Sequence, residues 1–452
     1  MPTNLQSLTF GDAFNSSLHG VNLPSSLQSL TFGYKFNQSL HGVTVPSNLQ
    51  SLTFGNQFNQ SLQGVPLPIT LHSLVLGEQF SQSMEDVSLP SALQSLTLGA
   101  NPSQRRDRHQ VFLGVTLPVL NSLTCDHALT QILQGVSLSS SLRSLAFGDR
   151  FNGSLEGVSL PGSLQSLTFG IAFNQNLRGA DLPSSLQNLT FGDEFNQVLQ
   201  EVSLPSSLQS LTFGSKFNQC LRGVGLPITL QSLTFGDQFN QSLKEVNLPS
   251  TLQILTLGDQ FNQALQGVSL PSTLQNLTLG DQFNQALKGV SLPCSLQSLA
   301  LGKNFNQNLR EAALPSSLKS LTLGSLHDAV MQSLYTFYDK NQSLEGVSLP
   351  SSLRCLRLGD TFNQRLQGAS LPSTLESLTL DGFNQSLQGV SLPRGLQSLA
   401  FGDKFDQNLQ GVSLPNTLQS LKLGEQYTQS LHGVNLPSDL RSIDGGLVMV
   451  WL

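Results

Sequence analysis

The sequence predicts a mainly β, right-handed solenoid of about twenty coils, each 22 residues long, with two short parallel strands per coil and little helix. Three observations support this fold class. Proline recurs at a step of 22 residues along most of the chain. Apolar residues inside each copy are spaced two apart, as in short strands. Finally, no copy leaves room for a long helix beside its two apolar segments.

Proline sets the register of the repeat. Ser139 takes its place in one copy, and only Pro66 and Pro102 fall outside the register. Because the copies follow one another without a linker, we expect residues 1–452 to form a single repeat solenoid. The prolines in register stand at positions 2, 24, 46, 68, 90, 118, 161, 183, 205, 227, 249, 271, 293, 315, 350, 372, 393, 415 and 437.

Each copy holds two apolar segments, and we expect a short strand in each. Residues 40–45 have the form Leu-x-x-Val-x-Val and end at Pro46, whereas residues 49–54 have the form Leu-x-x-Leu-x-Phe and end at Gly55. Apolar residues at i and i+2 indicate a strand rather than a helix. Proline lacks the N–H that a sheet ladder needs, and glycine tolerates a positive φ at a corner. Both segments are therefore bounded by residues that stop a strand.

Successive copies are expected to stack, because one unit cannot bury its apolar face alone. Residue n then lies above residue n + 22, and strands of successive coils pair in parallel at about 4.8 Å. Parallel crossovers favour a right-handed turn. The recurrent Phe-Asn-Gln motif, as at Phe36 and Phe58, fits this arrangement. We expect Phe to fill the core after the corner glycine, and Asn to bond turn backbone and form a ladder from coil to coil.

The pattern Leu-Pro-Ser-Ser-Leu-Gln-Ser-Leu-Thr-Phe-Gly-Asp-x-Phe-Asn-Gln-Ser-Leu resembles the FNIP repeat, a 22-residue relative of the leucine-rich repeats. The resemblance extends over essentially the whole chain. It implies a leucine-rich-repeat-like solenoid and an interaction scaffold of the kind found in protists and some large viruses. The family's Phe-Asn-x-Pro motif has Ser, Ala or Asn in place of its proline here, as at Ser39, Ala264 and Asn308. The chain is therefore a divergent subtype.

Two insertions and the two ends depart from the regular pattern. Residues 100–110 form a loop insertion with a dense basic cluster, and residues 325–340 form a loop or short helix with Asp328 as its N-cap. Insertions in solenoids leave as loops on one face, where they decorate the fold or bind a partner. We expect residues 441–452 to cap the last coil. The first coil begins with an open strand edge, which predicts self-association through the N-terminal edge or a truncated gene model.

Composition argues against several classes of function. Only 11% of residues are charged and the net charge is −6, so we expect no nucleic-acid partner. No apolar run reaches the roughly 20 residues of a membrane helix, and the start lacks a signal peptide. The four cysteines lie far apart, which favours a reducing, cytoplasmic location.

The sequence also lacks the motifs of known catalytic and metal sites. No phosphate loop, catalytic triad, metal spacing or cofactor motif is present, so we expect a non-enzymatic protein without a cofactor. Acidic residues recur at the corner after glycine, as at Asp237 and Asp281. Because Ser215 and Lys303 break this column, we predict no ordered ion site there.

The outward side of the second strand is the candidate interaction surface. Its Leu and Phe side chains point inward, so the Ser and Thr of Ser-x-Thr point outward, with a Gln column beside them. One interpretation is purely structural, because Thr suits strands and small polar residues suit solvent. The residues that we expect to contact a partner are Ser166, Thr168, Gln209, Ser210, Thr212, Gln231, Ser232, Thr234, Thr256 and Thr278.

Two functions compete for this surface. The first is a scaffold that binds an unidentified protein partner on the central coils, from Pro161 to Pro315, as the leucine-rich-repeat resemblance implies. The second is an ice-binding or other regular-surface-binding β-solenoid, which the regular array of hydroxyl groups suggests. The missing signal peptide, the Ser in one of the two columns and the expected curvature argue against ice binding.

Overall fold

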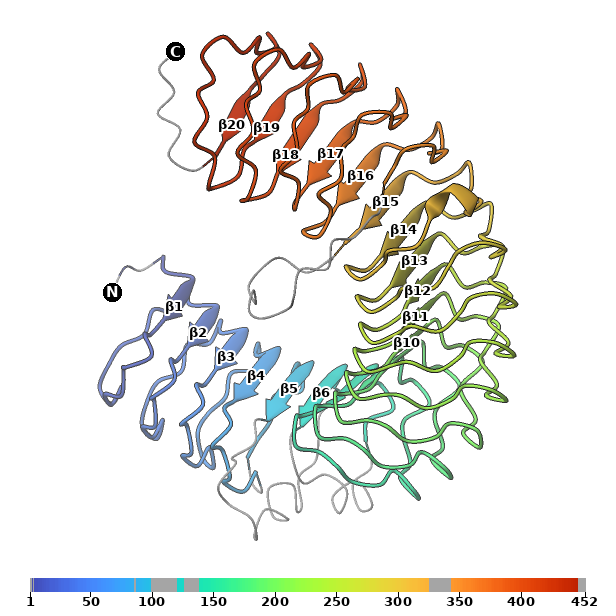
Figure 1. Ribbon diagram of the computed structural model, residues 1–452. Helices are drawn as coiled ribbons and strands as arrows, with labels where there is room; N and C mark the ends of the chain where they lie inside the picture. Colours follow the sequence, from blue (N-terminus) through green and yellow to red (C-terminus); the bar gives the residue numbers. More distant parts are fainter. Residues whose placement is uncertain are drawn as a thin grey trace. The chain divides into compact units, whose positions relative to one another are not determined.

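The computed structural model describes residues 2, 4–84, 87–98, 120–125, 138–324 and 343–445. The insertions predicted at 100–110 and 325–340 lie outside these residues, as do positions 446–452 of the predicted C-terminal cap. The described residues fall into two compact units, Met1–Gly214 and Ser215–Leu452. Each unit is a stack of coils in which short strands lie side by side (Figure 1).

The first unit is a parallel β-solenoid. Its strands pair in chain order and in register at a step of 22 residues where no insertion intervenes, as Ser7 pairs with Ser29 and Ser29 with Ser51. The predicted parallel stacking is confirmed. The strands of this unit are β1 (Ser7–Thr9), β2 (Ser29–Thr31), β3 (Ser51–Thr53), β4 (Ser73–Leu76), β5 (Ser95–Leu98), β6 (Ser122–Cys125), β7 (Ser144–Phe147), β8 (Ser166–Thr168), β9 (Asn188–Thr190) and β10 (Ser210–Thr212).

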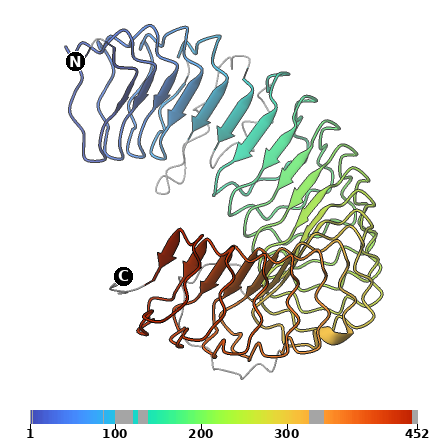
Figure 2. The ribbon, with the colours of Figure 1, turned by 90° about the horizontal axis from the view of Figure 1, so that it is seen from above.

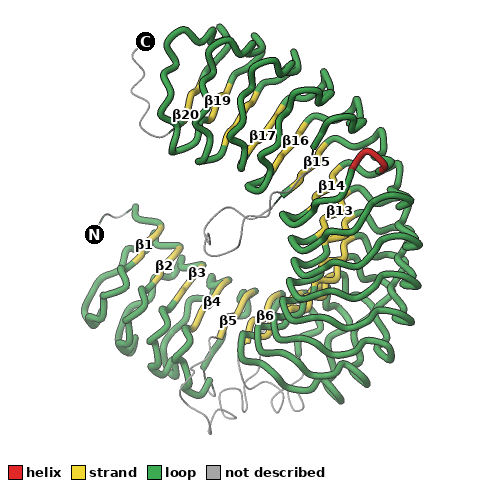
Figure 3. Tube along the Cα trace, in the orientation of Figure 1, coloured by secondary structure: helices red, strands yellow, loops and turns green. Residues whose placement is uncertain are grey.

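The second unit repeats the same architecture, with strands again pairing in parallel in chain order (Figure 2). The single helical element of the described residues is a short 3-10 turn, η2 (Leu309–Glu311), so almost no helix is present, as predicted (Figure 3). The strands are β11 (Ser232–Thr234), β12 (Ile254–Thr256), β13 (Asn276–Leu279), β14 (Ser298–Leu301), β15 (Ser320–Leu323), β16 (Cys355–Leu358), β17 (Ser377–Leu380), β18 (Ser398–Phe401), β19 (Ser420–Lys422) and β20 (Ser442–Asp444).

Each coil has one strand within the residues that the structure describes, and the expectation of two strands per coil is wrong there. The Ser-x-Thr segment forms the strand, whereas the segment that ends at proline forms a local turn. Before Pro46, the amide of Val43 donates to the carbonyl of Leu40 (3.0 Å), and Gly42 lies between them at φ 72°. This turn uses backbone groups that a second ladder would need, and the proline that follows has no N–H to donate.

Leucine and phenylalanine columns form the core of each unit. Leu211 has no exposed surface, and Phe213 is 2% exposed. Phe173 is also fully buried. Its ring stacks on Phe169 of the same coil, with the ring centroids 3.8 Å apart, and on Phe195 of the next coil, with the centroids 5.9 Å apart. The predicted position of Phe in the core is confirmed. Stacked rings add a specific contribution beyond the area that they bury.

Two ladders of polar side chains join successive coils. The Oδ1 atom of Asn240 accepts hydrogen bonds from the backbone N–H of Asn262 (2.9 Å) and from Nε2 of Gln263 (3.1 Å). This is the predicted Asn ladder, and it recurs in both units. A second ladder follows the proline, where the hydroxyl of Ser207 donates to the carbonyl of Leu186 in the preceding coil (2.7 Å). These polar groups are therefore occupied in holding the coils together.

The position that is proline in the FNIP repeat has a defined structural role in this chain. The hydroxyl of Ser39 accepts the backbone N–H of His41 (3.1 Å), and Oδ1 of Asn308 accepts that of Arg310 (2.8 Å). Side chains of Ser and Asn form such local turns by bonding backbone two residues ahead. In the copies with Ser or Asn at this position, a hydrogen-bonded turn thus replaces the rigid proline.

Candidate functional site

In the first unit, the predicted contact residues lie on the exposed side of β8 and β10. Ser166, Thr168, Ser210 and Thr212 are half-exposed, and Gln209 is exposed. Buried leucines alternate with these residues, so the inside and outside of the strand are assigned as predicted. The outward side of these strands presents hydroxyl and amide groups to solvent.

In the second unit, the corresponding residues lie on β11 to β13. Thr234, Thr256 and Thr278 follow one another in register and are half-exposed. Gln231 is exposed and Ser232 is half-exposed. The structure thus places the three threonines in one column, at the spacing of about 4.8 Å that neighbouring strands have.

The backbone around each strand holds this surface in place. The carbonyl of Gln187 accepts hydrogen bonds from the amides of both Gln209 (2.7 Å) and Ser210 (3.0 Å). The Ser207 hydroxyl adds its bond to the Leu186 carbonyl just before the strand. These bonds fix the backbone of each coil to its neighbour at the start of the strand. The backbone that carries the outward side chains is therefore preorganised, which lowers the entropic cost of binding a partner.

Several residues of this surface are absent from the predicted set. Thr190 pairs in register with both Thr168 and Thr212 and completes their column in the first unit. Beside it, Asn188 replaces the usual Ser and is exposed. In the second unit, Ile254 stands in the Ser column with 38% exposure. The 22-residue register alone would have identified all three, because each lies one step from a predicted residue.

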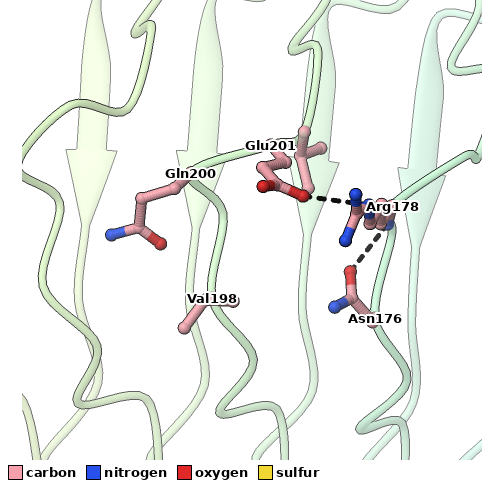
Figure 4. Close-up of a pocket in the computed structure, with 6 residues that line it drawn as sticks. Asn176, Arg178, Val198, Gln200 and Glu201 are labelled. Carbon is pink, nitrogen blue, oxygen red and sulfur yellow. Dashed lines mark hydrogen bonds and ion pairs between the residues drawn. The ribbon is translucent and has the colours of Figure 1, made fainter.

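A small cavity lies in the first unit, beside one of the turns that precede a proline. It has a volume of about 280 Å³ and is bordered by Asn176, Val198 and Gln200, together with an ion pair between Arg178 Nε and Glu201 Oε2 at 2.9 Å (Figure 4). Glu201 stands where most coils have the turn glycine. Both charged side chains are more than half exposed. The cavity is thus shallow and polar.

The same charge pairing recurs in the second unit. Arg222 pairs with Glu245 at 2.9 Å, and Lys288 pairs with Glu311 at 3.2 Å. Glu245 has φ 67°, the left-handed conformation that glycine adopts at this turn elsewhere. A basic residue one coil earlier therefore accompanies each of these glycine-to-glutamate replacements, which indicates a structural role for the pairs.

The corner acids bond backbone or side-chain groups of the next coil. Oδ1 of Asp12 accepts the amide of Tyr34 (3.2 Å), and Asp281 pairs with the ammonium of Lys303 at 3.3 Å. Within the described ranges, no group of three or more His, Cys, Asp or Glu residues is arranged to hold a metal ion. No helix in the described part of the chain is long and apolar enough to cross a membrane.

One strand per coil, a leucine column and an asparagine ladder define a solenoid of the leucine-rich-repeat class. The sequence matches the FNIP repeat over most of its length, and the chain belongs to this family. No curated protein matches the chain. The FNIP matches cover residues 1–35, 36–79, 58–101, 130–171, 173–216, 195–238, 239–282, 283–326, 341–382, 383–426 and 405–444.

Solved structures similar to the chain are leucine-rich-repeat proteins. CroV588, described as a novel circular LRR protein, is 36% identical with a TM-score of 0.63, and the match covers 93% of this chain and 69% of that one. YopM from Yersinia enterocolitica is 20% identical with a TM-score of 0.51, covering 98% and 91% of the two chains. The second likeness shows the fold alone. Family and fold are thus those of repeat scaffolds that are generally non-enzymatic.

Proposed function

We propose that the protein is a non-enzymatic scaffold that binds a protein partner through the exposed side of its strands. The observation behind this proposal is the row of half-exposed Ser, Thr and Gln side chains on β8 to β10 and on β11 to β13. The Asn column and the Ser or Thr column that follows the proline are occupied in ladders between coils, whereas these side chains stand on rigid strands and face solvent. Leucine-rich-repeat proteins commonly mediate protein interactions, which supports the same function.

The shape and chemistry of this surface favour a protein over a small ligand. Small-molecule sites are concave, mostly apolar and enclose most of the ligand. The strand surface instead offers extended rows of small polar groups between buried leucines. A stable protein interface needs roughly 800 Å² from each partner, so a protein partner has to contact many strands of a unit together with the turns beside them.

The experiment introduces lysine into each row. Thr212→Lys together with Thr234→Lys places one long charged side chain on each unit, and both native side chains are half-exposed. We expect the double variant to keep its fold, because surface changes usually cost under about 0.5 kcal/mol. We expect it to lose the partner that the wild-type protein captures from its source cell.

The matched control places lysine on other exposed positions of the two units. Val198 is 47% exposed and Ile228 is 77% exposed, and both lie outside the strands. Val198→Lys together with Ile228→Lys adds the same charge and should leave capture unchanged. If the strand variant still captures the partner, or if the control loses it equally, the proposed surface is wrong.

A second candidate function is binding to ice or to another regular surface. It is favoured by the in-register column of Thr234, Thr256 and Thr278. It is disfavoured by Arg357 and Lys422, which replace Thr in the same column of the second unit. Thermal hysteresis of the purified wild-type protein tests it, and a freezing point equal to the melting point removes this candidate.

A further inference from the structure

The exposed columns of the second unit change their chemistry at β15 to β17. Along β11 to β14 these columns hold Gln, Ser, Thr, Asn, Ile and Ala, without a formal charge. At β15 to β17 charged residues replace them or follow the strand directly. We call these residues the charged cluster: Lys319, Arg354, Arg357, Glu376 and Asp381.

The repeats themselves provide the reference for this change. Over the ten strands of the first unit, the same positions hold two formally charged residues in the sequence, Arg143 and Asp126. Coils with neutral residues at these positions adopt the same strand and the same register as β15 to β17. The fold therefore does not require charge there, and the charged cluster needs another explanation.

Contacts within the charged cluster leave much of its hydrogen-bonding capacity unused. Arg354 Nη1 pairs with Glu376 on the next strand, and Arg357 Nε pairs with Asp381 at 2.7 Å. Each guanidinium group thus bonds its carboxylate through one nitrogen, although it has five N–H donors. The ammonium of Lys319 donates to Gln297 at 3.1 Å. The cluster contains three cations and two carboxylates.

Stability explains only part of this arrangement. The Arg354 and Glu376 side chains are 58% and 40% exposed, and exposed ion pairs contribute about 0–1 kcal/mol. Arg357 has a clearer structural role, because it pairs with Asp381. Asp381 lies in a coil that is one residue shorter than the others, between Pro372 and Pro393, and the ion pair ties this irregular coil to its neighbour. Lys319 and the Arg354–Glu376 pair gain little for the fold and remain accessible.

We infer that the charged cluster determines partner specificity and receives acidic side chains of the protein partner. This inference rests on the proposed scaffold function, and it assigns the carboxylate-binding role to Lys319 and Arg354. Charge complementarity of this kind sets specificity and association rate more than total affinity. The whole chain has a net charge of −6, so its overall charge repels an acidic segment. Binding of such a segment therefore requires local contacts of the kind that the charged cluster offers.

The test uses two fluorescent twelve-residue peptides, one alternating Asp and Ser and the other alternating Lys and Ser. Fluorescence anisotropy with the full chain should show binding of the acidic peptide and not of the basic one. The principal variant is Arg354→Gln with Glu376→Gln, which removes the pair without changing net charge. This double variant should raise the Kd for the acidic peptide several-fold, and adding Lys319→Gln should bring the increase to roughly tenfold, equivalent to about 1.4 kcal/mol.

The control variant is Arg222→Gln with Glu245→Gln, which removes an exposed ion pair of the same unit at the turn, again without changing net charge. It should leave the Kd unchanged. The inference is overturned if the wild-type chain does not bind the acidic peptide, or if both double variants weaken binding equally. If peptide binding fails while Thr212→Lys and Thr234→Lys still abolish partner capture, the scaffold function stands and this inference falls.

Discussion

Glycine occupies two columns of the repeat for two different physical reasons. At the corner after the strand, a Cβ on Gly192 would overlap the carbonyl of Gly170 in the preceding coil. At the turn, Gly179 has φ 74°, and a Cβ added there would lie 3.9 Å from the nearest side-chain atom. The corner column is therefore restricted by the close approach of two coils, whereas the turn column is restricted by backbone conformation.

Replacing a corner glycine should destabilise the first unit. We expect Gly192→Ala to cost roughly 1–3 kcal/mol, the range for overpacking a close contact. Gly162→Ala is the control, since nothing lies within 4 Å of its Cβ position and its φ is not in the left-handed region. This control should be neutral or stabilising by about 0.4–1 kcal/mol. Urea unfolding of the two variants measures the difference, and equal midpoints would contradict the close-approach explanation.

An aspartate replaces asparagine in one step of the Asn ladder and makes that step sensitive to pH. Oδ1 of Asp406 accepts the backbone N–H of Thr428 (2.7 Å) and its hydroxyl (2.9 Å). The hydrogen bond from the Thr428 backbone is the main cause that lowers the pKa of Asp406 below 3.8. The folded state thus favours the ionised carboxylate, so its stabilisation is present above the unfolded pKa and is lost as pH falls through the folded value.

We therefore expect NMR titration of the Asp406 carboxyl to give a pKa below 3.8. Asp406→Asn keeps an acceptor oxygen, as in the other coils, and cannot ionise. The thermal midpoint of the wild-type chain should fall relative to that of this variant as pH decreases below about 4. A titrated pKa at or above the ordinary value would contradict the hydrogen-bonding explanation.

At the scale of the coil, the sequence predicts the backbone path and the core better than it predicts the candidate binding surface. Proline, glycine and alternating leucine fix the coil length, the strand and its inward face, because each acts through local sterics or burial. The expected second strand fails because Val43 and Leu40 close a turn that burial alone does not reveal. An extended segment and a turn can place the same apolar residues inward.

The candidate site is predictable only where the register is unbroken. The outward direction of Thr212 and Thr234 follows from strand alternation. By contrast, the register step from Ser320 to Cys355 is 35 residues, because an insertion separates the two strands. The insertion therefore hides from the sequence spacing that Lys319 lies beside Arg354, whereas Arg354 and Glu376 are 22 residues apart and follow the unbroken register.

Inward and outward residues of one strand should differ sharply in their effect on stability. Leu211 has no exposed surface, so Leu211→Ala should cost roughly 2–5 kcal/mol through the lost apolar contacts and the cavity that remains. Its neighbour Thr212 is half-exposed, and Thr212→Lys should change stability by less than about 0.5 kcal/mol. Thermal unfolding of the two variants compares them directly. Similar losses for both would mean that the strand alternation is assigned incorrectly.

At the scale of the whole molecule, each unit is held by contacts between neighbouring coils. Among the residues that the structure describes, every strand within a unit pairs with the strands before and after it in the chain and with no other. Stability in such a stack is approximately a sum of coil terms and nearest-neighbour terms. A coil with one neighbour should therefore open more often than a coil with two.

Hydrogen exchange tests this nearest-neighbour behaviour on two equivalent amides. Phe10 donates to the carbonyl of Thr31, and Phe169 donates to that of Thr190, both at 2.9 Å. Phe10 lies in the coil of β1, which pairs with β2 alone, and its side chain is half-buried. Phe169 is 2% exposed and lies in the coil of β8, which has a paired strand on each side. We expect the Phe10 amide to exchange at least roughly tenfold faster, because among the described strands β1 has one paired neighbour, so that local opening of its coil breaks one interface instead of two. Equal protection of the two amides would show instead that the first unit opens as a single cooperative body, and the additive description of the solenoid would then be wrong.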